Sequence, residues 1–317
     1  MSVVKLTTAW EHPFLKSQLN NLISKYTFEI DNDCEECDYW IIWGDLPHRT
    51  NHLTVKCPPE NIFYLTDEAH ENKTFLQKFL DQFPHIITCR DDLKHRHIIK
   101  THELNHWHVK KSFDEVNNET GIEKSKKLSV VCSDLTILSG HKKRYAFVNK
   151  MIGHFKDRID VFGRGFNPID DKWDALAPYK YSIAIENSVV QGYFTEKITE
   201  CYLAHTFPIY FGAPDITAYF DPRSLLKIDI AEYQTSILKI EELLEEDPWE
   251  NSVHLLTQQK LNYLNHYQLF PALAKILDNH EVSGNIKRKI KIYGHETFYR
   301  YYKIRKFWNT YKYLIYK

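Results

Sequence analysis

One segment, residues 179–212, constrains the fold more than any other part of the chain. It holds a β-patterned run from Tyr181 to Ile185, a short loop, an apolar-periodic helix that opens at Thr195, and a second strand from Phe207 to Phe211. This order of elements predicts a βαβ crossover between two parallel strands. Because such sheets bind ligands at the carboxyl ends of their strands, the loop after Ile185 is the expected binding edge.

The residues at that edge suggest an anionic ligand. Glu186 and Asn187 follow the first strand, and Thr195-Glu196-Lys197 begins the helix. Thr195 is a good N-cap, and the first turn of a helix favours anions because unpaired N–H groups point there. A cation such as Lys197 in that turn therefore suggests a bound phosphate. The alternative is an ordinary βαβ unit with a solvated lysine.

The same segment resembles the donor-binding signature of family-10 glycosyltransferases, the α1,3/α1,4-fucosyltransferases. The matching residues are Tyr-Lys-Tyr at 179–181, Glu186-Asn187, Tyr193-Phe-Thr-Glu-Lys197 and Pro208-Ile-Tyr-Phe-Gly212. The resemblance is dense from residue 128 to residue 229, weaker over 61–88, and closer to the bacterial branch than to the Golgi branch. Ile185 departs from the Phe that relatives commonly carry, which is a change within the core.

Length and periodicity predict two α/β domains. A chain of 317 residues exceeds a comfortable single core. Strands are predicted at 3–6, 39–43, 62–66, 85–88, 128–132 and 159–163, and helices at 13–25, 71–82 and 142–154. The polar stretch 110–127 is the predicted linker. The resemblance implies two doubly wound, Rossmann-like domains of GT-B type: an acceptor-side domain over 1–120 and a GDP-sugar domain over 121–282.

A second strand-to-helix turn supplies further donor contacts. Val131-Cys-Ser133-Asp134 leads to a helix that begins near Arg144. A diphosphate needs several cations or N–H groups from separate loops, and Arg144 and Lys197 both follow strands of the predicted sheet. The resemblance implies that Arg144 contacts the phosphate and leaving group, with Ser133 in the same donor-binding turn. Without the resemblance, the sequence would predict that Arg144 is an exposed arginine in a Lys-rich patch.

The resemblance also implies roles for four residues of the first segment. Glu196 matches the carboxylate that accepts hydrogen bonds from the donor ribose, as a carboxylate can from a diol. Asn187 and Tyr193 match donor contacts. Glu186 matches a carboxylate near the sugar and is a candidate catalytic residue. Alternatively, Glu186 is a structural acid that holds the loop by accepting backbone N–H bonds.

Transfer to an alcohol with inversion requires a base for the acceptor hydroxyl. The strand at 62–66 ends in Thr66-Asp67-Glu68, which resembles the general-base turn of the family and makes Glu68 the candidate base. If the alignment of this turn with the family is shifted by one residue, Asp67 takes the place of the base. Ala69 departs from the Pro or Asn of relatives. Both acids could instead belong to the N-terminal region of a surface helix.

No cofactor or metal is predicted. Five histidines fall between residues 95 and 108, but their spacing is not that of a zinc site and no Cys pair completes one. His or Trp107 in this tract could touch a sugar on the acceptor side. Under the GT-B resemblance, arginine and lysine neutralise the diphosphate. All six cysteines are expected to be free thiols, since they form no dense framework.

The C-terminal segment 283–317 is predicted to be a basic, aromatic helical tail. Residues 287–317 hold ten Lys/Arg and one acid, Glu296, for a charge of +9, with aromatics interleaved. Such a segment can dock on anionic lipid, or it can pack as a helix on the domains. No stretch approaches the roughly 20 apolar residues of a membrane span, and the first residues lack the apolar core of a signal peptide. We expect a cytoplasmic protein, peripheral on the inner face of the membrane.

The resemblance implies an inverting glycosyltransferase that moves L-fucose from GDP-β-L-fucose to a glycan hydroxyl, with an α1,3-linkage to GlcNAc or a similar sugar. The partners are the GDP-sugar donor, an oligosaccharide acceptor and an anionic membrane; nucleic acid is not expected. One alternative is transfer of another GDP-deoxyhexose. Another is a catalytically silent glycan- or nucleotide-binding module. The chain retains all three candidate functional residues, Glu68, Arg144 and Lys197, which argues against a loss of catalytic activity.

Overall fold

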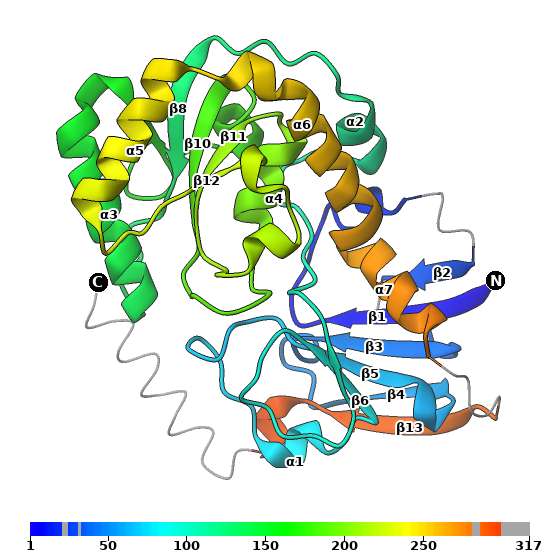
Figure 1. The fold of residues 1–317 in the computed structure, drawn as a ribbon. Coiled ribbons are helices and arrows are strands. Elements are labelled where there is room, and N and C mark those ends of the chain that lie inside the picture. Colours follow the sequence, from blue (N-terminus) through cyan, green and yellow to red (C-terminus); the bar gives the residue numbers. More distant parts are fainter. Residues whose placement is uncertain (21–24, 31–32, 281–285, 299–317) are drawn as a thin grey trace. The chain divides into compact units, whose positions relative to one another are not determined.

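A computed structural model describes residues 1–20, 25–30, 33–280 and 286–298 (Figure 1). The chain divides into two compact units. Unit 1 comprises residues 1–13, 21–101 and 274–317, and unit 2 comprises residues 14–20 and 102–273.

Unit 1 is built on a six-stranded parallel sheet in the order β2-β1-β3-β5-β6-β7. β3 is the most apolar strand, with all five residues buried, as expected for a central parallel strand covered on both faces. The strands are β1 (Ser2–Thr8), β2 (Tyr26–Glu29), β3 (Tyr39–Trp43), β5 (Ile62–Leu65), β6 (His85–Thr88) and β7 (Ile98–Lys100). The strands predicted in this half are confirmed.

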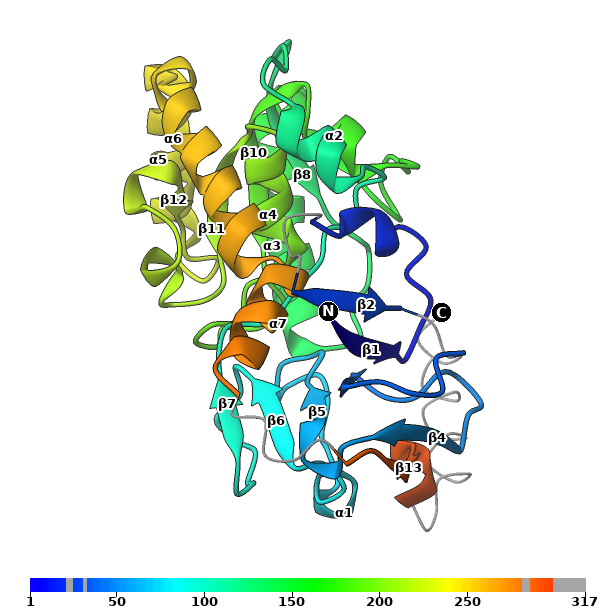
Figure 2. The same ribbon diagram turned by 90° about the vertical axis from the view of Figure 1, so that its right-hand side faces the viewer.

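A second, antiparallel pair joins β4 (His52–Cys57) to β13 (Arg288–Tyr293), apart from the main sheet (Figure 2). Its apolar side chains, Val55 and Ile292, are buried in the unit 1 core. β13 corrects the expectation of a helix over the start of the tail. Its sequence, RKIKIY, alternates polar and apolar residues with period two, and pairing with β4 buries the apolar face.

Two helices predicted in the first half are much shorter than expected. The range 13–25 holds only a 3-10 turn, Lys16–Gln18, within its described part, and the range 71–82 holds only α1 (Gln77–Leu80). In the second case tertiary contacts override the helical pattern. The backbone carbonyl of Lys73 accepts a bond from Arg90, and the Lys73 ammonium reaches back to Asp67.

Unit 2 contains a five-stranded parallel sheet in the order β12-β11-β10-β8-β9. The strands are β8 (Lys126–Val131), β9 (Asp160–Phe162), β10 (Tyr179–Ile185), β11 (Phe207–Phe211) and β12 (Leu226–Lys227). β10 pairs in register with β11 from Tyr181–Phe207 to Ile185–Phe211. The βαβ crossover predicted for residues 179–212 is therefore confirmed.

Six helices belong wholly or partly to unit 2: α2 (Phe113–Asn118), α3 (Ser139–Phe155), α4 (Glu196–Leu203), α5 (Tyr233–Glu246), α6 (Trp249–Asn262) and α7 (Leu269–Asp278). α3 and α5 lie side by side, joined by a bond from Tyr233 Oη to the carbonyl of Lys150, and α4 contacts α6 (Figure 1). The unit boundary falls within α7. The six described cysteines are free and five are buried, as expected.

The division of the chain differs from the predicted boundaries of 120, 121 and 282. The tract 102–120 belongs to unit 2, because Glu103 N–H donates to the carbonyl of Gly192 (2.7 Å) and Trp107 joins the unit 2 core. The last residues belong to unit 1 through β13. The rest of the predicted tail, residues 299–317, lies outside the described residues. Within the described ranges no helix is both long enough and apolar enough to cross a membrane.

Candidate functional site

A cavity of about 210 Å³ opens at the carboxyl ends of β8 and β10 in unit 2. Four residues predicted to bind the donor line it: Ser133, Arg144, Glu196 and Lys197. They come from the loop after β8, from α3 and from the first turn of α4. The fold thus brings together residues that are up to 64 positions apart in the sequence, at the edge where parallel sheets bind ligands.

The Arg144 guanidinium is buried and aimed by two side chains. Its Nη1 donates to Asn187 Oδ1 (2.6 Å) and its Nη2 donates to Ser133 Oγ (3.1 Å). The Nε atom is buried and has no hydrogen-bond partner in the described part of the chain. Buried polar groups are normally hydrogen-bonded. The N–H of Arg144 Nε is therefore a charged donor that an anion could bind.

The first turn of α4 orients Lys197. Thr195 caps the helix and donates its hydroxyl to Glu186, while Lys197 Nζ donates to Thr195 Oγ1 (2.9 Å). Lys197 Nζ also lies 3.2 Å from Glu186 Oε2 and 3.4 Å from Glu196 Oε1. Burial alone would lower the pKa of Lys197, but the two carboxylates raise it above its ordinary value. The ammonium is therefore held charged beside the cavity.

Glu186 makes the contacts expected of an acid that holds the loop between β10 and α4. It is 2% exposed, and its Oε1 accepts bonds from Thr195 N (2.8 Å) and Thr195 Oγ1 (3.0 Å). Burial raises the pKa of Glu186, and the charge of Lys197 offsets part of this effect. The carboxylate closes the loop between β10 and α4 and does not line the cavity. These contacts are those of the acid that holds the loop, while the catalytic role that the resemblance implies for Glu186 stays a prediction.

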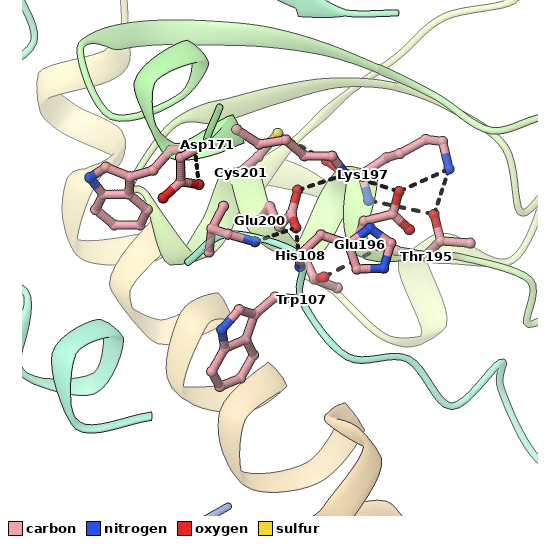
Figure 3. Close-up of polar contacts among 12 residues, drawn as sticks. Trp107, His108, Asp171, Thr195, Glu196, Lys197, Glu200 and Cys201 are labelled. Carbon is pink, nitrogen blue, oxygen red and sulfur yellow. Dashed lines mark hydrogen bonds and ion pairs between the residues drawn. The ribbon is translucent and has the colours of Figure 1, made fainter. Parts of the chain in front are cut away.

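Glu196 is held by a lysine that the sequence reasoning missed. Lys172 Nζ lies 3.2 Å from Glu196 Oε1 and 3.3 Å from Glu200 Oε2. Glu196 and Glu200 are one helical turn apart on α4, so they present one face (Figure 3). Burial alone would raise the pKa of Glu196, but Lys172 and Lys197 hold it well below its ordinary value. Glu196 is thus an ionised acceptor at the cavity.

Glu200 anchors this network to the backbone. Its Oε1 accepts N–H bonds from His108 and Val109 (3.2 Å to the latter), as Figure 3 shows for His108. Its side chain is 2% exposed. Neither Lys172 nor Glu200 belongs to a recognisable motif. Only the (i, i+4) spacing of Glu196 and Glu200 hinted at a shared cation.

The other two predicted donor contacts differ in position. Asn187 is half-buried and orients Arg144. Tyr193 is 5% exposed and does not line the cavity. The approach of α3 to this loop depends on Gly140, because a Cβ there would lie 1.7 Å from the carbonyl oxygen of Asn187.

Two further polar atoms near the loop were not foreseen. His141 Nδ1 and Ser188 Oγ are buried without hydrogen-bond partners among the residues that the structure describes. Burial lowers the pKa of His141, and the charges of Arg144 and Lys197 lower it further. Together with Arg144 Nε, these atoms form a set of unpartnered polar atoms around one edge of the sheet, which suits a polar ligand.

In unit 1 the two candidate bases have different surroundings. Both oxygens of Asp67 accept bonds from Lys73 Nζ (2.9 Å each), and its side chain is 3% exposed. Glu68 is half-buried, and its Oε2 accepts a bond from the amide of Asn72 (2.8 Å). Asp67 is therefore neutralised within the turn, whereas Glu68 keeps access to solvent.

A buried arginine fixes this turn. Arg90 is 1% exposed and donates to the backbone carbonyls of Glu68 (3.2 Å) and Lys73 (2.7 Å). Asp92 accepts two further bonds from the same guanidinium. Arg90 lies more than 20 residues after the turn, so no local pattern pointed to it.

The histidine tract 95–108 is spread over several different contacts. Across the described ranges no group of three or more His, Cys, Asp or Glu side chains is arranged to hold a metal ion. His102 stacks on Phe194 (5.2 Å between ring centroids) and bonds the carbonyl of Tyr267. Trp107 is 1% exposed and donates to the carbonyl of Lys111, so the idea that it touches a sugar was wrong.

The fold consists of two α/β units, each built on a parallel sheet, and in unit 2 cationic side chains gather at the carboxyl ends of the strands, where such sheets bind ligands. A crystal structure of an α1,3-fucosyltransferase shares this fold: the TM-score is 0.51 at 16% identity, covering 85% of this chain and 92% of that chain. The fold is thus of GT-B type with two Rossmann-like units.

Residues 122–268 match the family described as glycosyltransferase family 10 (fucosyltransferase) C-term. The resemblance seen in the sequence is confirmed over this range, and most of unit 2 is similar to the C-terminal domain of family-10 glycosyltransferases. An α-(1,3)-fucosyltransferase of Helicobacter pylori is 39% identical over 64 residues, 20% of this chain and 13% of that protein. A GDP-fucose protein O-fucosyltransferase 3 of Danio rerio is 29% identical over 137 residues, 38% of this chain and 30% of that protein. The matched segments span less than a third of either curated relative.

Proposed function

We propose that the protein is an inverting glycosyltransferase that moves L-fucose from GDP-β-L-fucose to a glycan hydroxyl. The observation that carries the proposal is the pairing of Arg144 and Lys197 at one cavity, with the Arg144 Nε atom buried and unused. Family membership of residues 122–268 supports fucosyl transfer in particular. The relative named as an α-(1,3)-fucosyltransferase favours an α1,3-linkage. GlcNAc or a similar sugar is proposed as the acceptor from the resemblance in the sequence.

The residues divide the work between donor and acceptor. Arg144 and Lys197 bind the diphosphate and stabilise the charge that develops on the leaving group, and their ammonium and guanidinium charges replace a bound cation in this role. Glu196, ionised and held by Lys172, accepts hydrogen bonds from the ribose hydroxyls. Ser133 and Asn187 orient Arg144. Tyr193 is buried outside the cavity, so the donor contact that the resemblance implies for it requires the loop to move.

Glu68 is the proposed base. It removes the proton of the acceptor hydroxyl as the oxygen attacks the anomeric carbon, so the C–O bond to the acceptor forms while the bond to GDP breaks. Asp67 is less suited because Lys73 already occupies both of its oxygens. Arg90 positions Glu68 through the backbone of the turn.

A donor panel tests this proposal. The purified chain is offered GDP-fucose, GDP-mannose, GDP and UDP-sugars, and binding is measured by calorimetry and hydrolysis by release of the nucleotide. We expect binding and slow hydrolysis of GDP-fucose that persist in EDTA. Preference for another GDP-deoxyhexose would replace GDP-fucose as the proposed donor. Binding without hydrolysis or transfer would indicate a catalytically silent module. Loss of turnover in EDTA would contradict the metal-free mechanism.

We further propose peripheral contact with anionic membranes on the cytoplasmic side. The support is the charge of +9 over residues 287–317 and the aromatics among them. The described part of this range is partly a strand, so the contact is assigned to residues 301–317. Sedimentation with anionic vesicles, with and without these residues and at rising salt, tests it. Equal sedimentation of both forms would contradict the proposal.

A further inference from the structure

An exposed tryptophan lies beside the candidate base turn in unit 1. β1, β3 and β5 are neighbours in the sheet, so the loops after their carboxyl ends lie next to each other. These loops carry Trp10, Gly44 and the Asp67-Glu68 turn. Trp10 is 44% exposed, whereas Trp43 at the end of β3 is 4% exposed. A large exposed aromatic side chain at the ligand edge of a sheet calls for an explanation.

The indole of Trp10 packs against two neighbouring rings. The hydroxyl of Thr8 donates to the carbonyl of Trp10 (2.8 Å) and so tightens the chain after β1. The ring lies 6.3 Å from the Trp43 ring and 5.6 Å from the His12 ring. His12 in turn stacks on Trp43 at 5.0 Å with an interplanar angle of 11°. These contacts hold the indole in place while leaving part of it in solvent.

Gly44 shows how close the indole is to the acidic turn. Its φ is +79°, and a Cβ there would lie 3.0 Å from Cη2 of Trp10 and 2.8 Å from Oδ2 of Asp67. The aromatic edge and the carboxylate therefore flank the same point, and Glu68 is the next residue in the chain. A side chain at this position would separate them, which is a physical reason for glycine in addition to its backbone conformation.

We propose that Trp10 is the stacking platform of a saccharide subsite for the acceptor. A pyranose ring has an apolar C–H face that packs on an indole and hydroxyls at its rim that bond to carboxylates. Of the two acids in this turn, half-buried Glu68 is the one that the rim hydroxyls would meet, because both oxygens of Asp67 are bonded to Lys73 and its side chain is 3% exposed. The inference rests on the proposed function: it names where the acceptor binds, next to the base that deprotonates it.

Kinetics and direct binding test the platform together. The variants are Trp10→Ala, Trp10→Tyr and, as a control, Leu238→Ala, which truncates a 65% exposed side chain on α5. N-acetyllactosamine and lactose serve as probes. We expect Trp10→Ala to raise the acceptor KM about tenfold and to weaken saccharide binding, seen by saturation-transfer NMR, by a similar factor. The Tyr variant should recover part of this loss, and the donor KM and GDP-fucose hydrolysis without acceptor should not change.

The outcomes separate this inference from the proposed function. Saccharide binding that depends on Trp10 in a protein without GDP-fucose hydrolysis would support the subsite and remove the donor assignment. Normal hydrolysis and transfer with an unchanged acceptor KM in Trp10→Ala would overturn the platform alone. Absence of saccharide binding by the unaltered chain at millimolar concentration would overturn it as well. An equal effect of Leu238→Ala would mean that the change is not specific to this edge.

Discussion

Replacing Lys172 by methionine should damage both the stability of unit 2 and its proposed donor site. The substitution keeps most of the side-chain stem and removes the charge that lies 3.2 Å from Glu196 and 3.3 Å from Glu200. At this distance and an effective dielectric of about 20, the Coulomb attraction is roughly 5 kcal/mol per pair. Desolvation offsets much of it, and Lys172 is 27% exposed, so we expect a net loss of about 2–3 kcal/mol.

The assay is thermal unfolding followed by circular dichroism, with Lys56→Met as the matched control. A loss of this size should lower the Tm of unit 2 by about 5–10 °C. Lys56 forms a comparable 2.9 Å pair with Glu36, but both side chains are 49% exposed. Because exposed pairs contribute at most about 1 kcal/mol, this control should shift the Tm by no more than about 2–4 °C.

The pH dependence gives the sign of the effect. Lys172 and Lys197 together depress the pKa of Glu196 against the effect of burial. This contribution to stability is therefore present above the unfolded pKa of about 4.3 and is lost as the pH falls through the folded value. The stability gap between wild type and Lys172→Met should be full at pH 7 and narrow below about pH 4. A gap that is independent of pH, or a Tm equal to that of wild type, would refute the reasoning.

Three further predictions concern the same two units. Arg144→Ala and Lys197→Ala should each lower kcat/KM for the donor, which corresponds to a loss of about 2–4 kcal/mol of transition-state stabilisation. Wild-type kinetics in either purified variant would remove the diphosphate assignment. Glu68→Gln should retain GDP binding and lose transfer by about 10²–10⁴-fold, whereas Asp67→Asn should mainly lower the Tm; the reverse pattern would make Asp67 the base. Gly140→Ala, whose Cβ would meet a carbonyl oxygen at 1.7 Å, should weaken GDP binding in calorimetry while far-UV dichroism stays unchanged, and normal affinity would show that the loop can move aside.

Local patterns in the sequence determined the donor edge of unit 2. The strand Phe207–Phe211 was predicted with its observed bounds, and Thr195 caps α4 as expected. These features depend on neighbours within a few residues: apolar runs make buried parallel strands, and a hydroxyl before a helix satisfies its free N–H groups. Arg144 and Lys197 also follow strands of one sheet, so the topology alone predicts that they converge.

Only the tertiary structure decided what those residues contact. Lys172 reaches Glu196 from 24 positions away, and Arg90 reaches the turn at Glu68 from 22 positions away. The segment at 288–293, expected to be helical, is a strand because β4 offers it a partner. The sequence left open whether Glu186 holds the loop, and the structure shows that its carboxylate accepts the backbone N–H of Thr195. Such pairs are long-range contacts between side chains, and a period read along one chain carries no record of them.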